Sequence, residues 1–285
     1  MPELAEAEFF RKRWTQAARP SPKILRVHTH DAKKLFRTAP APALRAALTD
    51  SVLTAAAAAA KQILFRFQRP ATSASPAIDA WLGIHLGMTG DLSVATPAHT
   101  PRKHDHLVLY TAAHALVFAD PRLFGRIQFH LGPDAPLWWA KIAPALISPA
   151  FTVAAAAAFL TRRGRAPIKA VLLMQERFPG IGNWMADEIL WRAAIHPQRR
   201  AGSLQPTEIR TLWCECRRVA RLALRMIAGH GEVLPPNLNA HIPRTWLFHH
   251  RWADGGRCPK THQPLLRAAV GGRTTCWSPA RQPFR

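Results

Sequence analysis

The sequence predicts a multidomain α+β protein in which a β-sandwich with flanking helices precedes a helical domain and a small β-hairpin. Short apolar runs separated by turn-rich segments fill residues 18–135, which is typical of a sandwich or barrel. Apolar residues recur at helical spacing from about residue 168 to 228, and β-like pieces follow in the basic tail. We therefore expect domains at residues 2–132, 137–231 and 243–285.

The first domain should open with a helix at 2–17, because acidic residues occupy its first turn and basic residues lie further along. Two alanine tracts, at 55–60 and 154–158, interrupt the pattern. Alanine favours helix, so the second tract fits one, whereas the first leads directly into a strand-like run and conflicts with it. The expected strands lie at 24–27, 63–67, 81–86, 107–110 and 116–118.

The helical domain should contain helices at 168–177, 184–194 and 207–228, with the sequence GIGN at 180–183 between the first two. The glycines allow close backbone approach, and Asn183 is a suitable N-cap. Because the free amides at a helix start form an anion site, this turn predicts a clamp on a DNA phosphate. An ordinary glycine-rich link between two helices would have the same local sequence.

The charge of the chain indicates a polyanionic partner. With 39 Lys and Arg against 17 Asp and Glu, the formal net charge is +22, which favours nucleic acid. An anionic membrane surface is the alternative, but no long apolar run or basic amphipathic anchor supports it. Glutamates near the start exclude a secretory pattern, and four cysteines without one indicate free thiols. We expect a cytoplasmic, nucleoid-associated monomer.

The first residues carry a second chemical signal. Removal of Met1 would leave Pro2 as a free secondary amine, and an α-amino group titrates near ~8. Part of it is therefore neutral and nucleophilic at neutral pH, able to attack a sugar C1′ without a separate base. Glu3 lies beside it as a proton donor. Taken alone, the same residues also fit an ordinary chain start with a helix-opening proline.

Six motifs fall in one order and resemble the formamidopyrimidine-DNA glycosylase/endonuclease VIII family of base-excision repair enzymes. The resemblance covers residues 2–282. It rests on MPELAEAE at 1–8, HLGMTG at 85–90, KHDH at 103–106, DPRLFG at 120–125, IK at 168–169 through GIGNWMADE at 180–188, and GRTT at 272–275.

This resemblance implies a β-sandwich, a helix–two-turn–helix domain and a finger hairpin that bind double-stranded DNA with a flipped nucleotide. It implies that Pro2 forms the iminium, Glu3 handles protons at the sugar, and Lys61 lies near the lesion phosphate. Arg273 matches the finger arginine assigned to δ-elimination. The implied DNA-binding residues are Met88, Arg122 and Phe124, which fill the void, together with His104, Asn183 and Lys169. Core packing remains open for Met88 and Phe124, as do an ordinary histidine role for His104 and helix capping for Lys169.

The finger departs from the family pattern of four zinc-binding cysteines. Only Cys258 remains, while Thr261, Ser278 and Arg281 occupy the other positions. Since structural zinc needs four ligands, the resemblance is to the zincless-finger members, and we expect no metal and no cofactor. Packing around Trp252 and Trp277 should then hold the hairpin.

Other departures concern positioning and specificity. Leu123 replaces an arginine beside Arg122, and the alanine tract replaces a basic-glycine lead into Lys61. The loop between residues 231 and 246 is short and rich in proline, although in the family this region helps to cover 8-oxoguanine.

The main hypothesis is a bifunctional DNA glycosylase/AP lyase that excises 8-oxoguanine and formamidopyrimidines and nicks the strand by β,δ-elimination. One alternative is an endonuclease VIII-like enzyme for oxidised pyrimidines. A second is a non-catalytic damaged-DNA binder, and a third, a generic RNA-binding protein, explains the charge but not the ordered motifs.

Overall fold

The computed structural model describes residues 2–20, 22–30, 34–36, 39–71, 73 and 77–284 of the chain. It divides into two compact units, residues 1–142 with 231–234, and residues 143–230 with 235–285. Met1 and Arg285, which belong to the predicted first motif and basic tail, lie outside the described residues. Among the described residues, no helix combines the length and apolar character that a membrane span requires.

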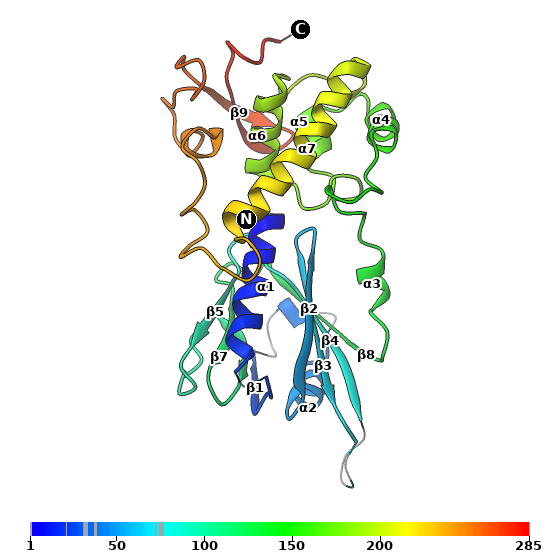
Figure 1. The fold of residues 1–285 in the computed structure, drawn as a ribbon, viewed down its shortest axis with the longest axis vertical. Helices are drawn as coiled ribbons and strands as arrows, with labels where there is room; N and C mark the ends of the chain where they lie inside the picture. Colours follow the sequence, from blue (N-terminus) through cyan, green and yellow to red (C-terminus); the bar gives the residue numbers. More distant parts are fainter. Residues whose placement is uncertain are drawn as a thin grey trace. The chain divides into compact units, whose positions relative to one another are not determined.

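The first unit contains two four-stranded antiparallel sheets, with strand orders β1-β6-β7-β5 and β2-β3-β4-β8 (Figure 1). Helix α1 packs on both sheets: the ring of Trp14 lies 5.4 Å from that of Phe65 in β3, and its indole N–H donates to Ser93 O in β5 at 3.0 Å. The elements are α1 (Leu4–Ala18), β1 (Arg26–Thr29), η1 (Lys34–Phe36), α2 (Ala41–Leu48), β2 (Val52–Ala59), β3 (Gln62–Arg69), β4 (Ile78–His85), β5 (Asp91–Ala95), β6 (Asp105–Tyr110), β7 (Ala115–Ala119), β8 (Arg126–Leu131) and α3 (Leu137–Ala140).

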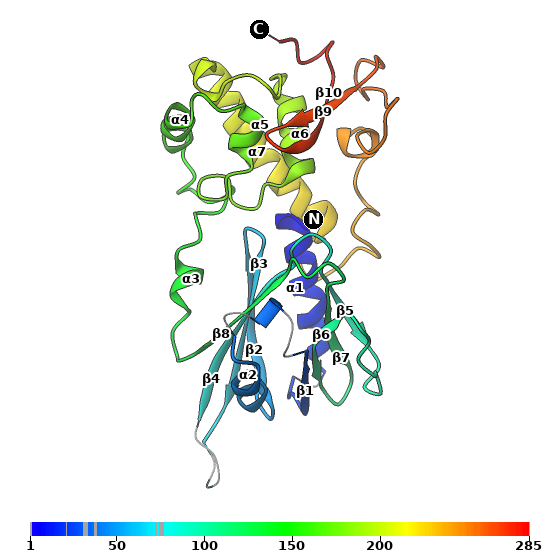
Figure 2. The same cartoon turned by 180° about the vertical axis from the view of Figure 1, so that it is seen from behind.

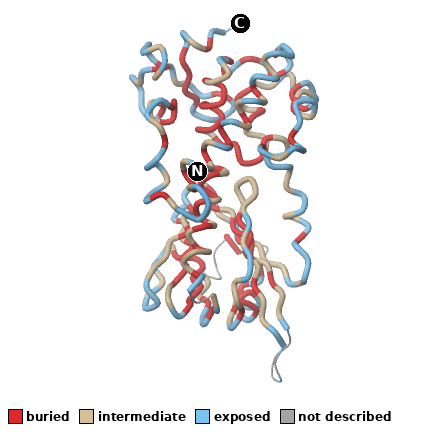
Figure 3. The backbone as a smooth tube through the Cα atoms, viewed as in Figure 1, coloured by how far each residue is buried: buried red, intermediate tan, exposed pale blue. Residues whose placement is uncertain are grey.

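The second unit is a bundle of helices with a hairpin on α6, seen from the hairpin side in Figure 2. Helix α6 is almost entirely buried, as Figure 3 shows, because α7 and the hairpin cover different faces of it. The elements are α4 (Val153–Arg162), α5 (Ile168–Leu172), α6 (Asn183–Ala193), η2 (Ala201–Ser203), α7 (Pro206–Ile227), η3 (Leu247–His250), β9 (Leu266–Val270) and β10 (Arg273–Trp277). The sandwich, helices and hairpin confirm the predicted fold class.

The two alanine tracts adopt different structures. The second lies within α4, as its helix preference predicts. All of the first except Ala60, which lies in the turn, belongs to β2, where the antiparallel ladder with β3 pairs its backbone groups and α1 packs against it. Tertiary pairing therefore overrides the local preference of alanine.

The helix expected at 168–177 is shorter than predicted, because α5 ends at Leu172. The Gln175 amide donates to the carbonyl oxygens of Leu173 and Ile181 at 2.8 and 2.9 Å, and its oxygen accepts from Gly180 N at 2.9 Å. These bonds replace helix bonds with a turn, which leads the chain directly into the 180–183 segment.

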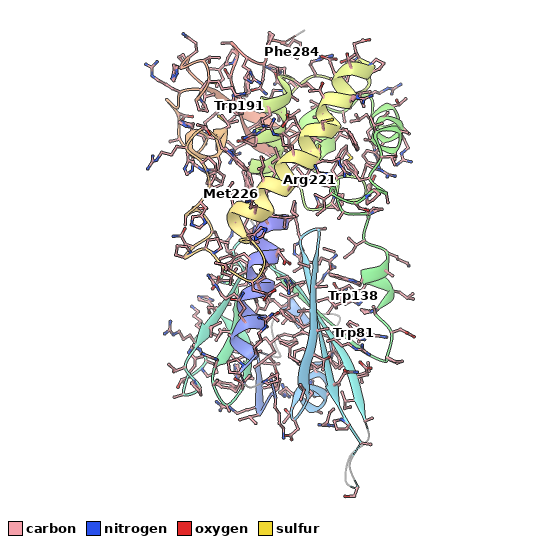
Figure 4. All side chains as sticks on the ribbon, viewed as in Figure 1. Trp81, Trp138, Trp191, Arg221, Met226 and Phe284 are labelled. Atoms are coloured by element: carbon pink, nitrogen blue, oxygen red, sulfur yellow. The ribbon has the colours of Figure 1, made fainter. Side chains whose placement is uncertain are left out.

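The connection after β8 is anchored on the first unit by Trp138. A Cβ atom on Gly83 would lie 2.3 Å from Trp138 Cη2, so the missing side chain allows the indole to lie on β4. Figure 4 shows Trp138 beside Trp81, whose indole N–H donates to Gly132 O at 2.9 Å. The segment 132–140 is thereby held against the sheet.

Candidate functional site

Strand register gathers several predicted site residues at one end of the β2-β3-β4-β8 sheet. Gln62 at the start of β3 pairs with His85 at the end of β4, and His85 pairs with Arg126 at the start of β8. The β2–β3 turn, the loop after β4 and the loop before β8 therefore lie side by side. These three segments carry Lys61, Met88, Arg122 and Phe124.

Asp120 organises the loop before β8, although it is absent from the predicted site residues. Its fully buried carboxylate accepts from Thr89 Oγ1 at 2.8 Å, from Gly125 N at 2.6 Å and from Arg122 N at 3.3 Å. Its backbone N–H donates to His104 O at 3.1 Å. An aspartate followed by proline is a turn signal in the sequence, and here the carboxylate and backbone of one aspartate join the motifs at 85–90, 103–106 and 120–125.

The Met88 and Phe124 loops touch through Gly87. At φ +62, a Cβ atom on Gly87 would lie 2.3 Å from the carbonyl carbon of Phe124, so only glycine allows this approach. The Phe124 side chain is 54% exposed, and the Arg122 guanidinium carbon lies 4.9 Å from the centre of its ring. Phe124 is therefore not a core residue, and Met88 is half-buried.

His85 lies beneath this loop cluster as a neutral acceptor. Burial, the Arg126 guanidinium and the Lys61 ammonium together lower its pKa to about 4. Its Nδ1 accepts from Gly87 N at 3.1 Å, which requires the unprotonated ring nitrogen. The imidazole thus holds the Gly87 turn only in its neutral form.

Pro2 and Glu3 precede α1. Glu3 is the N-cap and is 1% exposed; its N–H donates to Glu6 Oε2 at 3.1 Å, and the two glutamates form a reciprocal capping box. Pro2 is half-buried beside this cap. Figures 1 and 2 both draw the start of α1 and the β2–β3 turn at the same end of the first unit.

Lys61 is the second residue of the two-residue turn between Ala59 and Gln62. Ala60, the first, has φ +54, in the left-handed region that favours glycine. The turn therefore carries backbone strain where the sequence replaces a glycine, and the half-buried Lys61 follows it directly.

In the second unit, the 180–183 turn differs from its prediction in one detail. Gly182 is the N-cap of α6, and Asn183 is the first helical residue. The Asn183 side chain donates through Nδ2 to Thr274 O in β10 at 2.8 Å. Asn183 therefore joins the turn to the strand that begins at Arg273.

Lys169 lies under the same turn and is fully buried. Its ammonium donates to Asn183 O at 2.7 Å and forms an ion pair with Asp187. In this structure Lys169 supports the turn from inside, and no part of it faces solvent.

Arg273 is exposed at the start of β10. Gly271 and Gly272 form the two-residue turn before it, both with positive φ, as a type I′ hairpin turn requires. A Cβ atom on Gly271 would lie 2.6 Å from Ala170 Cβ in α5, so the hairpin tip packs closely on the residue after Lys169.

The finger residues do not fit a four-ligand zinc site. The Arg281 guanidinium donates to the carbonyl oxygens of Trp191 and Arg192 at 2.7 and 2.9 Å, and the Trp191 indole N–H donates to Cys258 Sγ at 3.3 Å. No group of three or more His, Cys, Asp or Glu side chains within the described part of the chain is arranged to hold a metal ion.

Packing at the finger base buries one of the two predicted tryptophans and includes a cluster that was not predicted. Trp277 is buried against His196, whereas Trp252 is 57% exposed. Cys258 belongs instead to a buried cluster with Trp191, Leu247, Leu265 and Cys276.

Family comparisons match both units of the chain. Residues 1–127 match the formamidopyrimidine-DNA glycosylase N-terminal domain family, and residues 137–233 match the formamidopyrimidine-DNA glycosylase H2TH domain family. The formamidopyrimidine-DNA glycosylase of Nocardia farcinica is 31% identical, with 99% of this chain and 98% of the relative aligned. That of Symbiobacterium thermophilum is 33% identical, with 99% and 90% aligned.

Solved structures of Lactococcus lactis Fpg share the fold. Its complex with DNA containing an abasic site has a TM-score of 0.81 at 23% identity, and its complex with DNA containing N7-benzyl-Fapy-dG has 0.82 at 24%. Both alignments cover 99% of this chain and 100% of the other. At this identity the structures show the fold alone. The sequence relatives, which align with 99% of the chain at 31% and 33% identity, show that the chain belongs to the formamidopyrimidine-DNA glycosylase family.

Proposed function

We propose that the protein is a DNA glycosylase/AP lyase that excises 8-oxoguanine and formamidopyrimidines from duplex DNA and nicks the strand by β,δ-elimination. The observation that carries this proposal is the placement of Pro2 and Glu3 at a capped helix start, at the same end of the first unit as the Lys61 turn. The similarity to named formamidopyrimidine-DNA glycosylases along nearly the whole chain supports the oxidised-purine branch.

In this mechanism the Pro2 nitrogen attacks C1′ of the damaged nucleotide, the base leaves, and an iminium joins the protein to the sugar. The Glu3 carboxyl group accepts and returns protons at the sugar. Its place at the positive end of α1 stabilises the carboxylate between transfers. Lys61 lies near the lesion phosphate. Met1 must be absent for Pro2 to react.

Apart from Lys169, which is fully buried, the remaining predicted residues bind the DNA. We assign Phe124, with Met88 and Arg122, to the space left by the flipped nucleotide, because its exposed ring resembles an intercalating wedge. His104, whose carbonyl oxygen is bound to Asp120, contacts the backbone near that loop. In the second unit the amides of the 180–183 turn bind phosphate, and Arg273 serves the δ-elimination.

Three domains divide this work in the proposal. Residues 2–132 carry the catalytic site, residues 137–231 form the helix–two-turn–helix DNA-binding domain, and residues 243–285 form a finger without zinc. Elemental analysis that finds stoichiometric zinc in the purified protein would overturn the last assignment.

Borohydride trapping tests the chemistry directly. Duplexes that carry 8-oxoguanine, a formamidopyrimidine, thymine glycol or an abasic site are incubated with the protein whose Met1 has been removed. Reduction of the iminium should leave a covalent protein–DNA adduct. Preference for thymine glycol would support the endonuclease VIII-like alternative, and binding without any adduct would support the non-catalytic binder.

The Pro2→Gly variant separates the nucleophile from a structural role. Loss of the secondary amine should lower strand nicking by at least about 100-fold, the scale of losing a covalent catalytic step. DNA affinity should stay near wild type, as measured by fluorescence anisotropy. Equal losses in nicking and affinity would mean that Pro2 only supports the fold.

A further inference from the structure

A buried charge cluster in the second unit has no role in the proposed mechanism. Asp187, fully buried in α6, forms an ion pair with Lys169 through one carboxylate oxygen. Its other oxygen accepts from Arg251 Nε and Nη2, at 3.0 and 2.5 Å, and from the backbone N–H of Cys276 at 3.1 Å. Lys169 and Arg251 are 0% and 4% exposed.

Such a cluster is an inefficient way to stabilise a fold. Taking charges out of water costs several kcal/mol per ion, and a packed apolar replacement is often as stable. The Asp187 arrangement does fix geometry, because its two carboxylate oxygens bind different partners.

Two partners of Asp187, Lys169 and the backbone of Cys276, contact or adjoin the segments to which the proposed function assigns phosphate binding and δ-elimination. Lys169, held by one oxygen, also donates to Asn183 O in the first turn of α6. Cys276, held by the other, lies in β10, three residues after Arg273. The bond from Asn183 Nδ2 to Thr274 O and the contact of Gly271 with Ala170 join the same two segments.

We propose that Asp187 is a positioning residue that holds the 180–183 turn and the Arg273 strand in one fixed arrangement, so that both grip the same DNA backbone. This inference rests on the proposed function of those two segments. Because a displacement of about 1 Å can cost on the order of 100-fold in rate, a rigid link between them matters more than its contribution to stability.

The Asp187→Asn variant breaks the link with the least change of shape. An asparagine has one acceptor oxygen, so it cannot face Lys169 on one side and Arg251 with Cys276 N on the other without opposing an N–H to a donor. We expect the ratio of β,δ- to β-elimination product on abasic-site DNA to fall at least about tenfold. The half-saturating DNA concentration should rise.

A second variant removes the effect of stability. In the triple variant Lys169→Met, Asp187→Leu, Arg251→Met, apolar side chains of similar length replace all three charges, so the melting temperature should stay near wild type. Its product ratio should nevertheless fall as in Asp187→Asn, at a temperature well below unfolding. Asp254→Asn is the matched control, because this exposed carboxylate pairs with Arg267 in the same finger and should leave the product ratio unchanged.

The outcomes separate the two proposals. A wild-type protein that forms no borohydride adduct would refute the proposed function itself. If wild type nicks the DNA and the folded triple variant shows the wild-type product ratio and half-saturating concentration, Asp187 is only structural. If the Asp187→Asn variant is defective but the triple variant is not, Asp187 is likewise only structural.

Discussion

A few buried polar residues position the exposed ones at this site. Asp120 accepts hydrogen bonds from Thr89 and from the backbone of its own loop, and it holds the loop that presents Arg122 and Phe124. Asp187 does the corresponding work in the second unit. Composition and motif order point to the exposed residues, whereas the roles of these two carboxylates can be inferred only from the hydrogen bonds that the structure shows.

His85 predicts a pH dependence of stability. Its pKa is lowered to about 4 when folded, from an ordinary value near 6.5, so the unfolded chain binds a proton first as the pH falls. The contribution of His85 to stability should therefore be constant above about pH 6.5 and should be lost as the pH falls from about 6.5 to 4.

The His85→Gln variant tests this assignment, because glutamine keeps an acceptor for Gly87 N but does not titrate. Denaturant unfolding at several pH values should show wild type losing stability relative to His85→Gln within that window only. A difference that does not change with pH would show that other groups cause the decline.

Ala60 predicts a stabilising substitution. A left-handed backbone costs an L-residue roughly 1–2 kcal/mol, and glycine avoids this cost. Ala60→Gly should therefore raise the free energy of unfolding by about 1 kcal/mol, measured by chemical denaturation. Ala59→Gly, in extended strand β2, is the control and should lower it by about 0.5–1 kcal/mol. Equal losses in both variants would contradict the strain at Ala60.

At the scale of elements, the finger hairpin separates features that neighbouring residues determine from features that depend on distant segments. Two adjacent glycines predict its turn, and the two-residue turn sets the register of the strands on either side. Its attachment to α5 and α6 does not follow from the sequence, because it depends on Gly271, Asn183 and Cys276 meeting partners about 90 to 100 residues away.

Gly271→Ala and Gly272→Ala separate turn strain from docking. Both positions have positive φ, so each substitution should cost about 1–2 kcal/mol of stability. Only Gly271→Ala also places a methyl group against Ala170, whereas a Cβ atom on Gly272 meets open space. Gly271→Ala should destabilise the protein more in thermal melts and lower δ-elimination. Equal effects would show that the contact with α5 is unimportant.

At the scale of the whole molecule, the charge of +22 predicts electrostatically driven DNA binding. Each neutralised phosphate releases condensed counterions, so the affinity for an undamaged duplex should fall steeply and linearly on a log–log plot against salt. Anisotropy titrations between about 50 and 200 mM salt measure the slope, and a protein with 6–10 phosphate contacts loses roughly 10³–10⁵ in affinity over that range. A flat response would refute the charge argument.

The sequence by itself determined the fold class, the family motifs and the candidates Pro2, Lys61, Phe124 and Arg273, since these depend on local pattern and residue chemistry. It also indicated that the first alanine tract has a helix preference but leads into a strand-like run. Only the pairing with β3 shows that the tract forms a strand. The tertiary structure alone decided that Lys169 is buried, that α5 stops at Leu172, and that the buried carboxylates of Asp120 and Asp187 each bind several groups within their own unit. The physical reason is that burial and hydrogen-bond partners arise from segments far apart in the chain, and no local pattern specifies where those segments meet.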